Sequence, residues 1–413
     1  MKRPYKIAYS AALLFSAISL HAHAASSTSD KSSAQFSAIL DGRYASYDND
    51  PEEYEIPGFS LGGEAELPEA GFSLGHIELG ASGEIDDKLR GQLTVAIAEH
   101  DGETEVELEE AFIESLGLGY GFTARAGRFF PSIGRVNSQH NHAWDFIDAP
   151  LVYQGLWGAK YIDDGLRLSW IAPTDTFLEF GVEGLAASGF PAGGERSDGI
   201  DSQVLFMNIG GDINSSSSWQ AGLSYHHADV VDREAGGHGH GHGEEEGEEE
   251  SEETPSFSGD SDTIGINAVF KWSPNGNPKN RHLIIQGEYF QRDEDGSIVL
   301  EGSDPLEQTS INGDQSGFYL QGIYKFAPHW RAGIRYDRLD SDNTGSDTEV
   351  LEEAGLLNEG INPTRYSVMT EWVPSEFSRI RLQYNRDESS ENKDSQLFLQ
   401  FTTSIGAHGA HNF

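Results

Sequence analysis

The feature that most constrains this chain is a side-chain alternation of period two, which recurs in segments of about ten residues. In the segment "SQLFLQFTTSIG", Leu397, Leu399 and Phe401 alternate with residues that are mostly polar or small. A period of two places one set of side chains on each face of an extended strand. The same alternation recurs in the segments 92–97, 263–272, 318–326 and 366–372. The chain is therefore expected to be all-β.

The lengths of the connections distinguish two all-β architectures. One is a soluble sandwich or propeller, and the other is a membrane barrel. Tight connections such as Asp86-Asp87 and Ala327-Pro328 alternate with long ones. The connections that read as long are 48–69, 129–150, 187–201, 230–259, 294–313 and 341–361. Outer-membrane barrels have short periplasmic turns, long extracellular loops and aromatic residues near both strand ends. We therefore expect a single transmembrane antiparallel β-barrel of 16 or 18 strands with long extracellular loops.

The strand count depends on one ambiguous stretch. Residues 149–177 can be divided into two strands or three, and bacterial single-chain barrels have even numbers of strands. At this size the side chains of the strands cannot fill the lumen, so an aqueous channel is expected.

The ends of the chain indicate export. Residues 1–24 combine a basic start, an apolar stretch and an Ala-His-Ala cleavage site, as in a secretory signal peptide. The Ser-rich residues 25–34 are expected to form a flexible tail, and 35–413 the barrel. The final Phe413 has the parity of the lipid-facing set, and a terminal aromatic resembles the assembly signal of outer-membrane barrels. The barrel-assembly machinery and outer-membrane lipid are therefore expected partners, and the bacterial outer membrane the expected location.

Composition excludes several classes of function. The chain has no cysteine, so disulfides, thiolate metal sites and cysteine nucleophiles are excluded. Its formal charge is −41, and loss of Lys2, Arg3 and Lys6 with the signal peptide would make it −44. Such a surface repels nucleic acid and attracts cations. The stretch GFSLG occurs twice, at residues 58–62 and 71–75, but helix-period segments are nearly absent, so a G-x-S-x-G nucleophile elbow is not indicated. Walker and H-E-x-x-H motifs are absent, and we expect no enzyme and no resident cofactor.

The expected extracellular loop 230–259 contains the stretch "GGHGHGHGEEEGEEESEE", residues 236–253, here called the His/Glu tract. Neutral imidazole is the commonest side-chain ligand for Zn²⁺, Cu²⁺ and Ni²⁺, and nearby glutamates add oxygen ligands and attract cations. A His-rich tract is a compositional signal for metal binding. The alternative is a solvated polar loop, which explains the glutamates but not the histidines. The candidate ligands in this tract are His238, His240, His242, Glu244, Glu245 and Glu246.

A second candidate is the pair His140 and His142, in the third expected external connection. In general porins this loop folds into the barrel, so by analogy the pair could relay metal at a constriction. Asp145 and Asp148 are the nearby carboxylates in sequence. The alternative is polar packing of the loop around Trp144.

Inward parity predicts a lumen of mixed charge. The residues concerned are Glu105, Glu107, Glu109, Thr123, Arg125, Gln286, Glu288, Arg331, Arg335, Asp337 and Arg381. Charged rings set the preference of a pore for cations or anions. The acidic exterior favours cations, although the same residues could form ion pairs that only stiffen the wall.

Several stretches resemble a bacterial family of zinc-regulated porin-like outer-membrane proteins or receptors. They are "GFSLGHIELGASGEIDDKL", "AEHDGETEVELEEAFIE", "RAGRFFPSIGRVNSQHNHAWDFIDAPLVYQG", "DDGLRLSWIAPTDTFLEFGVEG" and the closing "SIGAHGAH". The resemblance implies an outer-membrane barrel linked to zinc acquisition. A TonB-dependent receptor would need a plug domain and 22 strands, for which this chain is too short.

The sequence therefore predicts a porin-like channel that aids uptake of a divalent metal, most readily Zn²⁺, with the His/Glu tract as a capture loop. One alternative is a metal-binding surface receptor or adhesin without a conducting pore. Another is a general or anion-selective porin with an incidental loop. A homotrimer is one assembly that a porin would allow.

Overall fold

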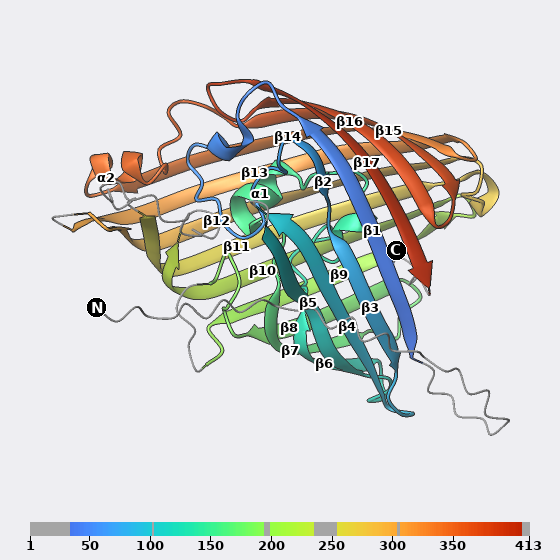
Figure 1. Cartoon of the computed structure of the whole chain (residues 1–413). Helices are drawn as coiled ribbons and strands as arrows, with labels where there is room; N and C mark the ends of the chain where they lie inside the picture. The colour runs from blue at the N-terminus through green and yellow to red at the C-terminus, as the bar shows by residue number, and fades with distance from the viewer. Residues whose placement is uncertain (1–33, 101–102, 194–198, 235–253, 304–305, 407–413) are drawn as a thin grey trace, which may run out of the picture.

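The computed structural model describes residues 34–100, 103–193, 199–234, 254–303 and 306–406 (Figure 1). The signal peptide, most of the tail, the His/Glu tract and Phe413 lie outside these residues. Every described strand pairs antiparallel with its neighbours. The strands are β1 (Gln35–Ser46), β2 (Gly71–Leu74), β3 (Ile77–Glu84), β4 (Leu89–His100), β5 (Glu103–Ser115), β6 (Phe122–Phe129), β7 (Asp163–Ile171), β8 (Phe177–Leu185), β9 (Ser202–Asn214), β10 (Ser217–Glu234), β11 (Thr254–Trp272), β12 (His282–Glu301), β13 (Glu307–Ala327), β14 (Trp330–Gly345), β15 (Thr364–Ser375), β16 (Ser378–Glu388) and β17 (Asp394–Gly406).

The strands form one closed ring. β1 pairs with β17 in a register that sets Ser37 opposite Gly406, and it pairs on its other side with β2 and β3. β2 and β3 follow one another along β1 and are separated only by Gly75 and His76, so together they fill one position. The 17 strands therefore make 16 barrel positions. This confirms the all-β antiparallel barrel and the smaller of the two expected strand numbers.

The two faces of each strand differ in polarity as the alternation predicts. Large apolar side chains point outward and are exposed, for example Ile264, Leu320, Ile334 and Val368. The intervening side chains point into the barrel and are largely polar. Aromatic side chains gather near the strand ends, where Trp330 lies 6.5 Å from Trp372 between ring centroids. An apolar outer belt with aromatic residues at its edges is the surface of a barrel that lies in lipid.

Two connections that read as long are shorter than expected, because their strands continue beyond the apolar belt. The stretch 294–313 is almost entirely strand, since β12 ends at Glu301 and β13 begins at Glu307. In 230–259, β10 extends to Glu234 and β11 begins at Thr254. The extensions reverse the alternation of the belt, because their outward side chains are mostly polar and exposed, whereas Ile298, Leu300 and Ile311 point inward and are buried in an apolar cluster.

The assignment of 149–177 to two or three strands was wrong. The stretch contains helix α1 (Leu151–Trp157) and only one complete strand, β7. Every residue of α1 is buried. Short apolar runs cannot be assigned to strand or helix by periodicity alone. Gly158, at φ 58°, ends the helix in the left-handed conformation that favours glycine.

The lumen contains a hydrophobic core of its own. Loop L1 (residues 47–70) and loop L3 (residues 130–162, which includes α1) fold inward (Figure 1). Ile56 and Phe59 of L1 and Trp157 of L3 belong to one buried apolar cluster with wall residues such as Phe290 and Leu339. Side chains of the strands alone do not fill the lumen, as expected, but the two loops fill much of it.

The described helices are short. Besides α1, the structure contains α2 (Thr348–Glu353) and three single 3-10 turns, η1 (Pro51–Glu53), η2 (Asn141–Ala143) and η3 (Pro274–Gly276). None of the helices in the described part of the chain has both the length and the apolar character needed to cross a bilayer.

Candidate functional site

Loop L3 is held across the lumen by two buried carboxylates. One is Asp148, near the middle of the loop, which accepts hydrogen bonds from the side chains of Arg335 (3.0 Å) and Arg365 (2.8 Å), and from Gln383 and Asn385. Burial alone would raise the pKa of Asp148, but the two guanidinium groups and the two amide donors outweigh this and lower it. Asp148 therefore stays ionised and fixes the loop to β14, β15 and β16.

The other anchor comes from the wall. The Glu288 carboxylate of β12 accepts hydrogen bonds from the backbone N–H groups of Arg135 (2.7 Å) and Val136 (2.9 Å). It also accepts one from the hydroxyl of Tyr153 in α1 (3.0 Å) and one from Tyr319 (2.8 Å). Together the two anchors leave the middle of L3, residues 138–147, in one position inside the barrel.

Both histidines of L3 lie at this position and meet carboxylates from β3 and β5. The Nδ1 atom of His140 lies 3.1 Å from Glu109 Oε2, and its Nε2 atom lies 3.0 Å from Glu110 Oε2. The Nδ1 atom of His142 lies 2.7 Å from Glu78 Oε1. The two imidazole rings stack with centroids 5.6 Å apart. We call these five residues the imidazole–carboxylate cluster.

A β-bulge brings two consecutive glutamates into the cluster. Thr94 of β4 pairs with Glu110 and Val95 pairs with Leu108, so Glu109 is an extra residue in β5. A bulge leaves one residue unpaired and redirects the side chains beside it. Regular alternation would send only one of Glu109 and Glu110 inward, whereas here both face His140. Sequence parity identified Glu109 as inward and missed Glu110.

A lysine completes the charges around the cluster. Lys160, near the end of L3, is fully buried and forms an ion pair with Glu109 Oε1. Burial opposes its charge, but Glu109, Glu64 and Glu78 outweigh this and raise the pKa of Lys160 above its usual value. Burial likewise opposes the charge of His140, yet its hydrogen bonds with Glu109 and Glu110 raise its pKa to about 10. Both groups therefore carry positive charge at neutral pH.

The cluster has the donor set and spacing of a metal site. One ligand atom each from Glu78, Glu109 and His140 lie within 4.8 Å of one another. Imidazole nitrogen and carboxylate oxygen are common ligands of Zn²⁺, whereas Ca²⁺ and Mg²⁺ select oxygen ligands. A second group of this kind lies on the outer wall, where His227 of β10 approaches Asp229 and Asp260.

His142 of the cluster lines a large cavity inside the barrel. This cavity, of about 1170 Å³, lies between L1, L3 and the wall formed by β1, β4 and β5. Ten acidic side chains line it, compared with four arginines and lysines. The acidic residues are Asp41, Glu64, Glu66, Glu69, Glu105, Glu107, Asp148, Asp232, Glu234 and Glu301. A concave surface with excess negative charge concentrates cations.

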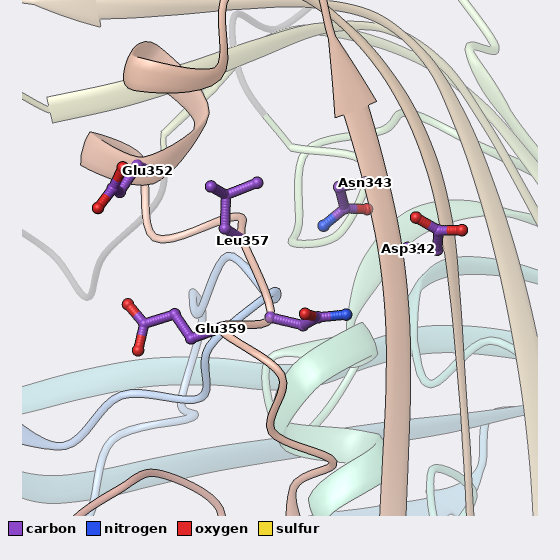
Figure 2. Close-up of a pocket in the computed structure, with 6 residues that line it drawn as sticks. Asp342, Asn343, Glu352, Leu357 and Glu359 are labelled. Atoms are coloured by element: carbon purple, nitrogen blue, oxygen red, sulfur yellow. The ribbon is translucent and has the colours of Figure 1, made fainter.

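The extracellular end is acidic as well. On the outward faces of five neighbouring strands, cross-strand pairing sets one row of residues side by side: His227, Asp262, Asp293, Asp314 and Asp342. A hollow of about 370 Å³ near α2 is lined by Asp342, Asn343, Glu352, Leu357, Asn358 and Glu359. In Figure 2, Asn343 lies on the side of β14 that faces Leu357, and Asp342 lies on the other side of the strand. Carboxylates directly opposite one another across strands repel, so this rim also attracts cations.

The structure tests only part of the sequence-predicted site. His140 and His142 do lie together inside the lumen. Their expected partners were wrong, because Asp145 binds Arg331 and Asp148 binds the arginines of β14 and β15, while β3 and β5 supply the carboxylates. Trp144 is buried beside them, as the packing alternative expects. The residues His238, His240, His242, Glu244, Glu245 and Glu246 lie outside the described residues and remain a prediction.

Comparison with known proteins supports the fold. No protein-family model matches the chain. Over 395 residues it is 29% identical to an uncharacterized protein of Aquifex aeolicus, an alignment that covers 89% of this chain and 76% of that protein. The trimer form of OmpT, an outer membrane protein of Vibrio cholerae, superimposes with a TM-score of 0.53 at 12% identity, covering 91% of this chain and 100% of that one. An anion-selective porin from Comamonas acidovorans gives a TM-score of 0.50 at 11% identity, with 91% and 100% covered.

This chain has the porin fold. Together with the apolar outer belt, the fold places the protein in a bacterial outer membrane. The barrel strands are therefore membrane-spanning elements, and L1 and L3 are extracellular connections folded into a porin lumen.

Proposed function

We propose that the protein is a porin-like channel that aids passage of divalent metal ions, most readily Zn²⁺, across the outer membrane. The observation that carries this proposal is the imidazole–carboxylate cluster, in which L3 brings two histidines against three glutamates beside the cavity. A general diffusion pore needs charged residues at its constriction. It does not need nitrogen and oxygen atoms placed close enough together to bind one metal ion at the same time.

The proposed path begins at the acidic rim. Negative charge there and in the cavity would raise the local concentration of cations and speed their entry. The His/Glu tract is proposed as the external capture loop, with His238, His240 and His242 as ligands and Glu244 to Glu246 beside them. The ion would then pass to His140 and His142 and move onward down its gradient, with no catalysed reaction.

The resemblance to zinc-regulated porin-like proteins supports zinc as the cargo, and the donor set favours zinc over calcium or magnesium. The trimer form of OmpT supports a homotrimer as the proposed assembly. The porin from Comamonas acidovorans is anion-selective, so the fold leaves the choice of ion to the charges of the lumen.

A second function has one observation in its favour. Because L1 and L3 build an apolar core inside the lumen, the barrel could serve as a metal-binding receptor with little conduction. Ion flux separates the two functions, since a receptor would bind zinc without passing it.

The test uses the refolded chain in liposomes that contain a fluorescent zinc indicator. The double variant His140→Ala, His142→Ala should lower the initial zinc influx at least tenfold at low zinc concentrations, since loss of even a partner that only orients a metal ligand costs roughly 10- to 100-fold in metal affinity. His329→Ala, in an exposed periplasmic turn, is the matched control. Removal of residues 236–253 should reduce influx only at low zinc concentrations.

Equal influx through the wild-type chain and the double variant would make the cluster a structural feature and the protein a general porin. Zinc binding without influx in any form would support the receptor function instead.

A further inference from the structure

Lys160 forms an ion pair with Glu109 of the imidazole–carboxylate cluster, and its charged ammonium group cannot itself bind a metal ion. Its ammonium group is fully buried and lies over the ring of Phe130, 4.7 Å from the centroid. Lysine is rarely buried without a partner, and here the partner is one of the candidate ligands. The question is what this charge does at a site that would hold a cation.

The Glu109 carboxylate is divided between two positive groups. Its Oε1 atom pairs with Lys160, while its Oε2 atom faces His140 at 3.1 Å. A metal ion at the cluster would therefore find only one oxygen of Glu109 available. The ammonium group also lies close enough to Glu64 and Glu78 to interact with both, so it offsets charge over the whole site.

The backbone keeps Lys160 in place. Gly158 and Ala159, the two residues before it, have φ angles of 58° and 64°, and α1 before them is entirely buried. A left-handed conformation at an alanine is uncommon and persists only where the surrounding packing imposes it. The ammonium group is therefore a fixed component of the site and not a side chain that swings away.

We propose that Lys160 is a built-in counter-cation that weakens metal binding at the cluster, so that a bound ion is released. This inference rests on the proposed function. A channel site must attract an ion and also let it leave. Three buried glutamates and two imidazoles would otherwise hold a divalent cation tightly, and a fixed positive charge shared with Glu109 lowers that affinity without removing a ligand.

The test compares zinc affinity and zinc flux in the refolded chain. Lys160→Met keeps the length of the side chain and removes its charge, so zinc should bind at least tenfold more tightly, because a unit charge about 4 Å from a divalent ion changes its affinity by more than tenfold even at the dielectric of water. Maximal influx at saturating zinc should fall, because release becomes slow. Lys160→Arg keeps the charge and should restore wild-type affinity and influx.

Two further variants keep the test decisive. Lys160→Gln removes the charge but retains a hydrogen-bond donor for Glu109, so it repeats the test if the methionine variant does not fold. Lys393→Met, in an exposed ion pair with Glu388, controls for loss of any lysine. Affinity is measured by equilibrium dialysis of zinc, and folding by resistance of the barrel to heat in detergent.

The outcomes separate this inference from the proposed function. Tighter binding with slower influx in both neutral variants supports it. Unchanged affinity in folded neutral variants, with zinc still transported by the wild-type chain, overturns the role of Lys160 and leaves the function standing. Absence of zinc binding at the cluster in the wild-type and neutral variants overturns both.

Discussion

His140 has a carboxylate at each ring nitrogen, and the two carboxylates come from consecutive residues of one strand. Glu109 and Glu110 can both reach the ring only because the bulge in β5 interrupts the alternation. The contact of His140 with both carboxylates therefore depends on the one extra residue in β5. At neutral pH the protonated imidazole of His140 lies between the two glutamates, and a metal ion would displace a proton to bind its ring nitrogen.

Glu110 is the member of the cluster whose role is easiest to isolate. Glu110→Gln keeps the hydrogen bond from Thr94, which lies 3.2 Å away, and removes one negative charge beside His140. We expect zinc affinity to fall roughly 10- to 100-fold, the usual cost of disturbing a group that orients a metal ligand, with the barrel still folded. Glu52→Gln, in the exposed η1 turn of L1, should leave affinity unchanged. Equal affinity in both variants, measured by equilibrium dialysis, would remove Glu110 from the site.

A signal for Glu110 was present in the sequence. Outward apolar residues fall on even positions at Val106 and Leu108 and on an odd position at Ile113. Such a change of parity within one strand requires one extra residue. It predicts a bulge, but it does not predict which histidine the redirected side chains meet, because that depends on a loop from elsewhere in the chain.

At the scale of elements, buried charges help to position L3, beside the apolar core that its helix α1 enters. Asp148 fixes the middle of the loop to β14, β15 and β16. Removing one member of a buried ionic network leaves the remaining charges uncompensated. The residues of L3 that anchor it and those that form the cluster are different, so the loop can be released while its histidines stay intact.

Asp148→Asn should therefore release L3. We expect a loss of about 3–5 kcal/mol in the stability of the docked loop, the typical cost of breaking a buried ion pair. Single-channel conductance should rise and L3 should become sensitive to protease, whereas Asp347→Asn, at the exposed start of α2, should change neither. Conductance equal to that of the wild-type channel would show that L3 does not depend on Asp148.

The same contact has a defined pH dependence. The pKa of Asp148 is lowered in the folded state, so its contribution is complete above the ordinary aspartate pKa of about 3.9 and is lost as the pH falls below that. In the wild-type channel, L3 should stay protected from an acid-tolerant protease at pH 5 and lose protection only below about pH 4. Loss of protection near pH 6 would exclude Asp148 as the controlling group.

Most elements follow from the sequence because each strand carries its own alternating pattern. The exceptions have a common physical cause. Residues 151–157 form a helix because they pack inside the lumen, where tertiary contacts and not periodicity decide their conformation. The cluster could be predicted only as far as His140 and His142. Its carboxylates from β3 and β5 depend on how L3 crosses the barrel, and no local pattern records that path.

At the scale of the whole molecule, negative charge is distributed along the proposed path, from the rim through the cavity to the cluster. The acidic residues behind the formal charge of −41 are therefore arranged along this path and are not only numerous. Such a field speeds the entry of cations and is weakened by salt, because the screening length falls from about 30 Å at 0.01 M to about 3 Å at 1 M.

We expect the channel to prefer cations and to lose much of this preference in high salt. In planar bilayers, the reversal potential under a potassium chloride gradient should indicate strong cation selectivity near 0.01 M and weak selectivity near 1 M. The exposed variant Lys279→Met, remote from the cavity lining, serves as the control. A preference for anions at low salt would contradict the role assigned to the acidic cavity.

Because L1 and L3 form a core inside the barrel, the strands that border this core have different surroundings on their two faces. Its outer side meets lipid chains, which are fluid and accommodate any apolar shape. Its inner side meets other side chains at crystal-like density, where even one methylene group is felt. Outward-facing positions can therefore accept many apolar substitutions, whereas inward-facing positions tolerate few changes in side-chain volume. In this protein the mutable surface and the constrained interior alternate residue by residue along a single strand.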